Sequence, residues 1–410
     1  MKIILFANTD WYLYNFRLAL AKAILAQGHE LVLLSPPGKY SERLKEAGFR
    51  WIPLPLERRR LNPLAELITI LRIARIYHNE RPDLVHHFTL KCVLYGSIAA
   101  RLVRVKAVVN ALAGLGHIFS NASPRAKALR QIVKLVCRVI LRPSEVIFQN
   151  PENHRAFLKL GLVCEETSHL IRGSGVDVER FKPCAKQATN GGRYVLLASR
   201  LLWAKGVSDY VEAARLVRQC HPEVVFLLAG ETDMGNPGAI PQSVIDEWKR
   251  QGDVEVLGQC EDMRALIEKV DLVALPTYYG EGVPRILIEA AASGKPIVAT
   301  DMPGCREIVQ HGINGALVPV RDSKQLALAI RNILLDDERR YEMGKSSRLL
   351  ACSDFSEEQV IDKTFQVYQK SLPADKVISD RAWAGANPAE PNEIISAYSS
   401  TNLAPRTSWK

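Results

Sequence analysis

Short apolar runs alternate with longer helical patterns along most of this 410-residue chain, and the alternation occurs as two separate series. Short apolar runs bounded by turn residues are typical of buried strands. Strands that alternate with helices predict parallel sheets covered by helices on both faces. Because a chain of this length exceeds one ordinary core, the two series predict an α/β protein with two doubly wound domains.

A polar, glycine-rich segment at residues 173–192 separates the two series and is the expected linker. The first domain is expected at 1–172, the second at 193–355 and a further helix at 356–372. Residues 373–410 have few apolar residues and are expected to be disordered. Strands are expected at 2–7, 30–34, 50–53, 83–87, 107–111, 145–149, 194–198, 224–229, 254–257, 272–275 and 297–299, and helices at 16–26, 125–141 and 286–292 among others.

Composition indicates a cytoplasmic protein without a spanning helix. The short apolar run at the N-terminus is typical of a first strand and not of a signal peptide. The eight cysteines are scattered without a CxxC pair, which favours reduced thiols over a disulfide framework or a zinc site. Charge is uneven, because residues 1–172 hold 26 Lys and Arg against 12 Asp and Glu, whereas the remainder holds 28 against 32. The basic first half indicates an anionic partner, either a membrane surface or nucleic acid.

Two carboxylates, Glu281 and Glu289, lie eight residues apart around a turn between an apolar strand and an apolar helix. Glu281 is therefore expected at the carboxyl end of a parallel strand, with Glu289 about two helical turns further on. Ligands of open α/β sheets bind at that edge. Two carboxylates there can accept hydrogen bonds from the hydroxyls of a sugar and of a ribose; the alternative is two ordinary surface glutamates.

Two cations, Arg200 and Lys205, follow the first strand of the second domain and precede a helix. A planar guanidinium can bridge two phosphate oxygens, and an ammonium adds a compact charge. The pair therefore suits a diphosphate. The alternative is two solvated cations near a helix start.

Together these motifs resemble the Glu-x7-Glu and Arg-x4-Lys-Gly signatures of glycosyltransferase family 4, which are retaining enzymes of the GT-B fold. The segment Trp-Tyr-Leu-Tyr-Asn-Phe-Arg at 11–17 resembles the opening of a bacterial subgroup that extends glycans on undecaprenyl diphosphate and is N-acetylgalactosaminyltransferase-like. The resemblance spans roughly residues 1–372. It implies two Rossmann-like domains facing a cleft, with the acceptor in the first and the nucleotide sugar in the second. It also implies a last helix that crosses back to brace the first domain.

The resemblance implies a role for each site residue and no metal or cofactor, since cations stabilise the leaving diphosphate. Arg200 and Lys205 would do this, while Glu281 contacts the donor sugar and Glu289 the ribose. Gly230 would line the same cleft, or is a simple turn glycine. The backbone amides of Gly282 and Val283 would point at the donor. Asn15 and Arg17 are polar candidates on the acceptor side, and Arg17 is alternatively a surface charge.

Three histidines of the first domain are candidates for orienting the donor sugar. Many members of the family carry a histidine just before a Gly-Leu-Gly turn, where this chain has Ala113. The nearest histidine is His117, after that turn, whereas His86 and His87 are the last two residues of the strand expected at 83–87. The alternative for each is a packed or turn histidine.

Five cations at spacings of three or four lie between Ser123 and Pro143, beside an apolar face. They predict a basic amphipathic helix that lies on an anionic bilayer. The alternative is the solvated face of a core-packed helix. These membrane-contact candidates are Lys127, Arg130, Lys134, Arg138 and Arg142.

The sequence thus predicts a hexosyltransferase. Its expected reaction moves a hexose or N-acetylhexosamine from a nucleotide sugar, with UDP expected, to a lipid-diphosphate-linked saccharide in O-antigen, lipopolysaccharide or capsule polysaccharide assembly. It would be peripherally associated with the inner face of the bacterial plasma membrane. Two alternatives are a sugar-nucleotide 2-epimerase of the same layout and a basic nucleic-acid-binding protein, although the basic helix lacks interleaved aromatic residues.

Overall fold

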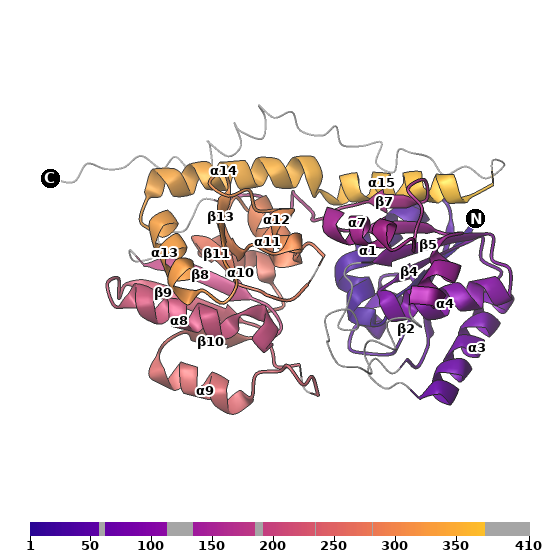
Figure 1. The fold of residues 1–410 in the computed structure, drawn as a ribbon, viewed down its shortest axis with the longest axis horizontal. Helices are drawn as coiled ribbons and strands as arrows, with labels where there is room; N and C mark the ends of the chain where they lie inside the picture. Colours follow the sequence, from indigo (N-terminus) through magenta and orange to yellow (C-terminus); the bar gives the residue numbers. More distant parts are fainter. Residues whose placement is uncertain (57–61, 113–133, 185–191, 234, 281, 374–410) are drawn as a thin grey trace. The chain divides into compact units, whose positions relative to one another are not determined.

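The computed structural model describes residues 1–56, 62–112, 134–184, 192–233, 235–280 and 282–373. These residues form two compact units (Figure 1). Of the described residues, unit 1 comprises those of Met1–Gly175 together with 357–373, and unit 2 comprises those of Val176–Ser356. Each unit holds one parallel sheet with helices on both faces, which confirms the predicted α/β class.

Unit 1 contains a seven-stranded sheet in the order β3-β2-β1-β4-β5-β6-β7. Every neighbouring pair is parallel. The strands are β1 (Lys2–Phe6), β2 (Glu30–Ser35), β3 (Arg50–Pro53), β4 (Leu84–Phe88), β5 (Ala107–Leu112), β6 (Glu145–Phe148) and β7 (Ser168–Leu170). The helices are α1 (Asp10–Ala26), α2 (Ser41–Glu46), α3 (Pro63–Glu80), α4 (Leu90–Leu102), a helix at 134–141, α7 (Pro151–Lys159) and α15 (Glu357–Ser371).

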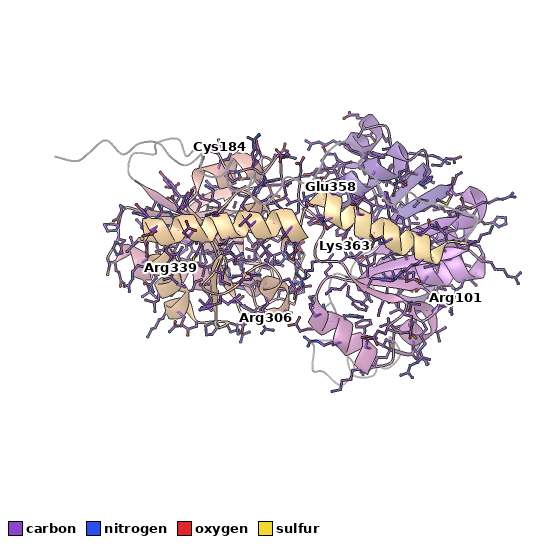
Figure 2. All side chains as sticks on the ribbon, turned by 90° about the horizontal axis from the view of Figure 1, so that it is seen from above. Arg101, Cys184, Arg306, Arg339, Glu358 and Lys363 are labelled. Atoms are coloured by element: carbon purple, nitrogen blue, oxygen red, sulfur yellow. The ribbon has the colours of Figure 1, made fainter. Side chains whose placement is uncertain are left out.

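Alternation along β1 divides the core of unit 1 into two layers. Ile3 and Leu5 pack with α1 and α15, whereas Ile4 and Phe6 pack with α3 and α4. Figure 1 shows α1 and α15 on one side of this sheet and α3 and α4 on the other. The last helix, α15, is therefore part of the core of unit 1, with Lys363 labelled on its exposed side in Figure 2.

Helix α1 begins at Asp10 and not at the expected Phe16. Thr9 has an extended backbone, and its hydroxyl accepts a hydrogen bond from the amide of Tyr12 at 3.1 Å. This cap starts the helix six residues before the expected position, ahead of the aromatic run at 11–17. Asn15 and Arg17 consequently lie on a helix.

Unit 2 contains a six-stranded parallel sheet in the order β10-β9-β8-β11-β12-β13. Its strands are β8 (Arg193–Ala198), β9 (Val224–Ala229), β10 (Glu255–Gly258), β11 (Leu272–Leu275), β12 (Ile297–Thr300) and β13 (Gly315–Val318). The helices are η1 (Trp203–Lys205), α8 (Val207–Arg218), α9 (Gln242–Gln251), α10 (Met263–Lys269), α11 (Arg285–Ala292), α12 (Pro303–Arg306), α13 (Ser323–Leu334) and α14 (Asp337–Asp354).

Candidate functional site

Arg200 and Lys205 lie at the point where the strand order of the unit 2 sheet reverses. The order places β8, the first strand of the unit, beside β11, so the chain leaves these neighbours toward opposite sides of the sheet. Such a switch point is where ligands of doubly wound sheets bind. Arg200 and Lys205 follow β8, and Gly282 and Val283 follow β11. The structure thus brings the predicted cations and the glycine turn to one edge.

Hydrogen bonds join the two loops at this edge. The carbonyl oxygen of Ala204 accepts from the amide of Tyr278 at 3.0 Å and from the hydroxyl of Thr277 at 3.2 Å. The loop after β8 also bonds to the loop after β9, since the amide of Leu201 donates to the Glu231 carbonyl at 3.0 Å. The loops after three adjacent strands are therefore held to one another before any ligand arrives.

Two glycines permit these loops to approach closely. A Cβ on Gly206, whose φ is +72°, would lie 2.0 Å from the carbonyl oxygen of Pro276. A Cβ on Gly230, whose φ is +139°, would lie 1.8 Å from the carbonyl oxygen of Ser199. Neither position accepts a side chain. Gly230 is thus required by a backbone contact between the ends of β8 and β9, beyond the needs of a simple turn.

Lys205 and Arg200 differ in burial. Lys205 is only 7% exposed, and its ammonium lies 5.8 Å from the centroid of the Tyr279 ring, a residue that follows β11. Arg200 has a half-exposed side chain and donates to the carboxylate of Asp233 at 3.0 Å. An ion pair this exposed is weak and exchangeable. Arg200 can therefore release Asp233 for an anion at little cost.

Of the two predicted carboxylates, Glu281 lies outside the described residues. Glu289 is buried on α11 and accepts from the guanidinium of Arg285 at 2.8 Å. Burial raises the pKa of Glu289, and Arg285 offsets part of that rise. Helix α11 begins at Arg285, one residue before its predicted start, and Glu289 lies about one turn into it. The expected separation of Glu289 from Glu281 stays a prediction. Gly282 and Val283 are buried just before the helix.

Unit 1 has its own switch point, between β1 and β4. Asn15 and Arg17 lie on α1, which follows β1, and Asn15 donates to the carbonyl of Trp11 at 3.0 Å. Arg17 is 6% exposed, so it is not a surface charge. Its guanidinium stacks on Phe88 at 4.4 Å from the ring centroid and donates to the hydroxyl of Tyr12 at 2.9 Å.

His86 and His87 are both buried on β4 and point into opposite layers. His87 contacts Tyr77 at 3.0 Å and Asn110 at 2.8 Å, so both ring nitrogens are engaged inside the core. This geometry favours the packed-histidine alternative for His87. The Nδ1 of His86 bonds to the hydroxyl of Tyr368 on α15 at 2.7 Å. His117 lies outside the described residues.

Burial keeps both of these histidines neutral. It lowers the pKa of His87 to about 4, against a small opposing effect of Asn110. Burial lowers the pKa of His86 well below the ordinary value, and the nearby charge of Arg17 adds to the effect. A neutral imidazole can hydrogen-bond a hydroxyl but cannot serve as a cation.

The structure describes part of the predicted basic helix, and Lys127 and Arg130 lie outside that part. In the helix at 134–141, Arg138 donates to the carbonyls of Leu160 and Gly161, at 3.1 and 3.3 Å, and thus binds the end of α7. Arg142 is exposed and Lys134 half-buried. Membrane contact by these side chains stays a prediction.

Two residues at these edges escaped the sequence analysis. Asp233 follows β9 and pairs with Arg200, and its position just after a strand of the same sheet was a usable signal. Tyr368 contacts His86 from a helix that is distant in the sequence, and no local pattern indicates such a contact.

Among the described residues, no group of three or more His, Cys, Asp or Glu side chains could hold a metal ion. Within the same ranges, every helix is too short or too polar to cross a membrane.

Comparisons with known proteins agree with this architecture. The family model for group 1 glycosyl transferases matches residues 180–350, and a glycosyl transferase 4-like model matches residues 2–150. The solved structure of Anabaena HepE in complex with UDP superposes with a TM-score of 0.72 at 21% identity, over 90% of this chain and 100% of that one. The fold is therefore GT-B, and the chain belongs to the family 4 glycosyltransferases.

Curated relatives narrow the class further. The chain is 24% identical, over 91% of its length and 99% of the relative, to the Campylobacter jejuni N,N'-diacetylbacillosaminyl-diphospho-undecaprenol alpha-1,3-N-acetylgalactosaminyltransferase. It is 22% identical, over 76% of its length and 81% of the relative, to an Escherichia coli UDP-Gal:alpha-D-GlcNAc-diphosphoundecaprenol alpha-1,3-galactosyltransferase. The predicted hexosyltransferase activity is confirmed at this level, and neither alternative function is favoured.

Proposed function

We propose that this glycosyltransferase moves a hexose or N-acetylhexosamine from a UDP sugar to a saccharide carried on a lipid diphosphate, with retention of the anomeric configuration and without a metal. Relatives that act on undecaprenyl-diphosphate glycans support the acceptor class. The UDP in the related Anabaena structure supports the nucleotide. The product would be an extended lipid-linked glycan for a surface polysaccharide.

The observation that carries this proposal is the position of Lys205. Lys205 lies in the loop after β8, one residue before the Gly206 cap of α8, and its ammonium lies 5.8 Å from the centroid of the Tyr279 ring in the loop after β11. The amino end of a helix favours negative charge, and a nearly buried cation is weakly screened. Together with Arg200, this edge is suited to a diphosphate whose charge grows as it leaves.

In the proposed reaction, the bond between the anomeric carbon and the diphosphate oxygen breaks while the acceptor hydroxyl attacks from the same face. The acceptor proton passes to the departing diphosphate. Arg200 and Lys205 stabilise the charge on that group, and Glu289 accepts from the ribose hydroxyls. Glu281 would contact the donor sugar, as the family resemblance implies.

A donor screen tests the proposal directly. The purified protein is incubated with each labelled UDP sugar and a polyprenyl-diphosphate monosaccharide, with and without EDTA. We expect one UDP sugar to yield a lipid-linked disaccharide at the same rate in EDTA, and NMR of the product to show the anomeric configuration of the donor. Inversion would refute retention, and loss of activity in EDTA would refute the metal-free mechanism.

Two controls separate this function from the alternatives. A 2-epimerase would convert UDP-N-acetylglucosamine without any acceptor, so formation of the epimer alone would contradict the proposal. A nucleic-acid-binding protein would bind DNA or RNA with steep salt dependence and would show no transfer.

A further inference from the structure

Helix α3 exposes large apolar side chains along one side. Leu64 is 73% exposed, Leu67 53%, Ile68 49% and Leu71 54%. Their spacing of three and four residues places them in one stripe on the helix surface. The opposite side of α3 is buried, with Ile73 and Tyr77 in the core. The helix thus carries apolar side chains on two sides, and unit 1 covers only one of them.

The exposed stripe of α3 has no counterpart in unit 2. The exposed large apolar residues in the described part of that unit are separated along the chain, at Trp203, Leu257, Ile313, Val320, Leu328 and Leu335. Single exposed apolar residues are ordinary, whereas a contiguous patch marks an interaction surface. Figure 1 shows α3 on the side of unit 1's sheet opposite α1 and α15.

Neighbouring helices of the same layer also expose apolar side chains. Helix α4 contributes to the α3 core and also packs with the helix at 134–141. Leu102 at the end of α4 is 60% exposed, and Leu135 and Val139 on the helix at 134–141 are 64% and 52% exposed. Three helices that cover one side of the unit 1 sheet therefore all present leucine or valine to solvent.

Cations border this apolar surface. Arg72 and Arg75 are exposed on the second half of α3, and Arg101, labelled in Figure 2, and Arg104 are exposed at the end of α4. The two acidic residues of α3 are both paired. Glu66 binds Lys91 at 2.8 Å, and Glu80 binds Arg50 at 2.6 Å. The border of the surface is accordingly positive.

We propose that the outer side of α3 is a membrane-docking surface, which inserts Leu64, Leu67, Ile68 and Leu71 into the interfacial region of an anionic bilayer while Arg72 and Arg75 contact lipid phosphates. An interfacial helix with apolar and cationic side chains binds anionic lipid in this way. The inference rests on the proposed function only in requiring an acceptor that stays in the membrane.

Charge distinguishes a bilayer from a second copy of the chain. A two-fold contact places the same surface on both partners, so α3 against α3 would bring the arginines of one copy close to those of the other. The phosphates of an anionic bilayer instead neutralise the arginines, and its apolar interior accepts the leucine side chains. We therefore commit to lipid as the occupant.

Vesicle sedimentation tests the proposal with the full chain. The wild type should bind vesicles of phosphatidylglycerol and phosphatidylcholine, and bind phosphatidylcholine alone more weakly. Leu67→Gln with Leu71→Gln should weaken binding by at least about tenfold, because two exposed leucines lose their apolar insertion. The matched control is Leu328→Gln with Leu335→Gln in unit 2, which should bind like the wild type.

A transfer assay separates this proposal from the proposed function. The α3 variant should keep the wild-type rate with a short-chain, water-soluble acceptor and lose rate only with a vesicle-embedded acceptor. An absence of transfer by the wild type would refute the proposed function. The vesicle-binding result would still test the docking surface independently.

Three outcomes would overturn the docking surface. The α3 variant and the wild type could bind vesicles equally. The wild type could fail to bind anionic vesicles at all. Sedimentation velocity without lipid could show a dimer that the α3 substitutions dissociate, which would assign the surface to a second copy.

Discussion

The sheets of the two units share the order of their first six strands but differ in the segment that follows the first strand. In unit 2 the loop after β8 exposes Arg200 and holds Lys205 beside the loop after β11. In unit 1 the helix after β1 buries Arg17 against Phe88 and Tyr12. One topology thus offers a positive charge at its switch point in one unit and covers it with aromatic rings in the other. The fold supplies the place for a site, and the loops decide its chemistry.

The largest effect is expected at Gly230, where the loops after β8 and β9 of unit 2 approach each other closely. Gly230→Ala should destabilise unit 2 by about 4 kcal/mol or more, because the new methyl group overlaps the Ser199 carbonyl and the backbone is left-handed. Chemical unfolding measures the loss. Gly252→Ala is the matched control, since its φ is +71° with nothing within 4 Å of the added Cβ, and should cost only about 1 kcal/mol. Equal costs would remove the argument for a rigid edge.

Lys205→Met should lower kcat by about a hundredfold to a thousandfold, or about 3 kcal/mol of barrier, because a charge that acts on the departing diphosphate is lost. Methionine keeps the length of the side chain in its nearly buried position. Steady-state kinetics give the effect, and Lys249→Met on the exposed side of α9 is the control. A change confined to KM would show that Lys205 binds the donor without stabilising the transition state.

Acidification should unfold unit 1 before unit 2. An unfolded histidine takes up a proton near pH 6.5, whereas burial lowers the pKa of His87 to about 4. The unfolded chain therefore binds more protons in this window. The contribution of neutral His87 to the free energy of unfolding is fully present above pH 6.5. It falls as the pH drops toward 4, by no more than about 3 kcal/mol. In unit 2, burial raises the pKa of Glu289, so its contribution changes in the opposite direction.

Hydrogen exchange at a series of pH values resolves the two units. Peptides from residues 1–112 should lose protection first as the pH falls, and His87→Asn, which cannot take up a proton, should make that loss depend less steeply on pH. Earlier loss of protection in residues 192–356 would contradict the assignment of acid sensitivity to unit 1.

The smallest effect is expected for the contact between Tyr368 and His86. Tyr368→Phe removes the hydroxyl and leaves a buried ring nitrogen unpaired, which should cost unit 1 about 1–2 kcal/mol. Tyr210→Phe, which removes hydroxyl bonds to two strand carbonyls in unit 2, is the matched change in the other unit. Unit-resolved hydrogen exchange should place each loss in its own unit.

Sequence patterning predicted the strands well, because each buried parallel strand is a short continuous apolar run. It predicted β3 and β9 at their observed bounds, but it did not identify the three-residue β7 or the short β13. It also placed the start of α1 too late. The aromatic run at 11–16 has no helical period, so the pattern gave no sign of the helix that the Thr9 cap begins. Boundaries that depend on one side-chain hydrogen bond are not visible in a periodic pattern.

The candidate site was predicted in part. Arg200 and Lys205 follow a strand within one motif, so local order along the chain was enough to place them at the sheet edge. The pairing of Arg200 with Asp233 and the burial of Arg17 depend on segments from separate strands. Such contacts follow from the packing of the sheet, which a single sequence does not display.

The place of α15 in the core of unit 1 has a consequence for synthesis on the ribosome. Phe365 and Tyr368 fill that core, yet they are translated after all of unit 2. One hydrophobic layer of unit 1 therefore stays open in the nascent chain until the residues of α15 have emerged from the ribosome. We expect residues 176–356 to become protease-resistant earlier in translation than residues 1–175, a reversal of the usual vectorial order.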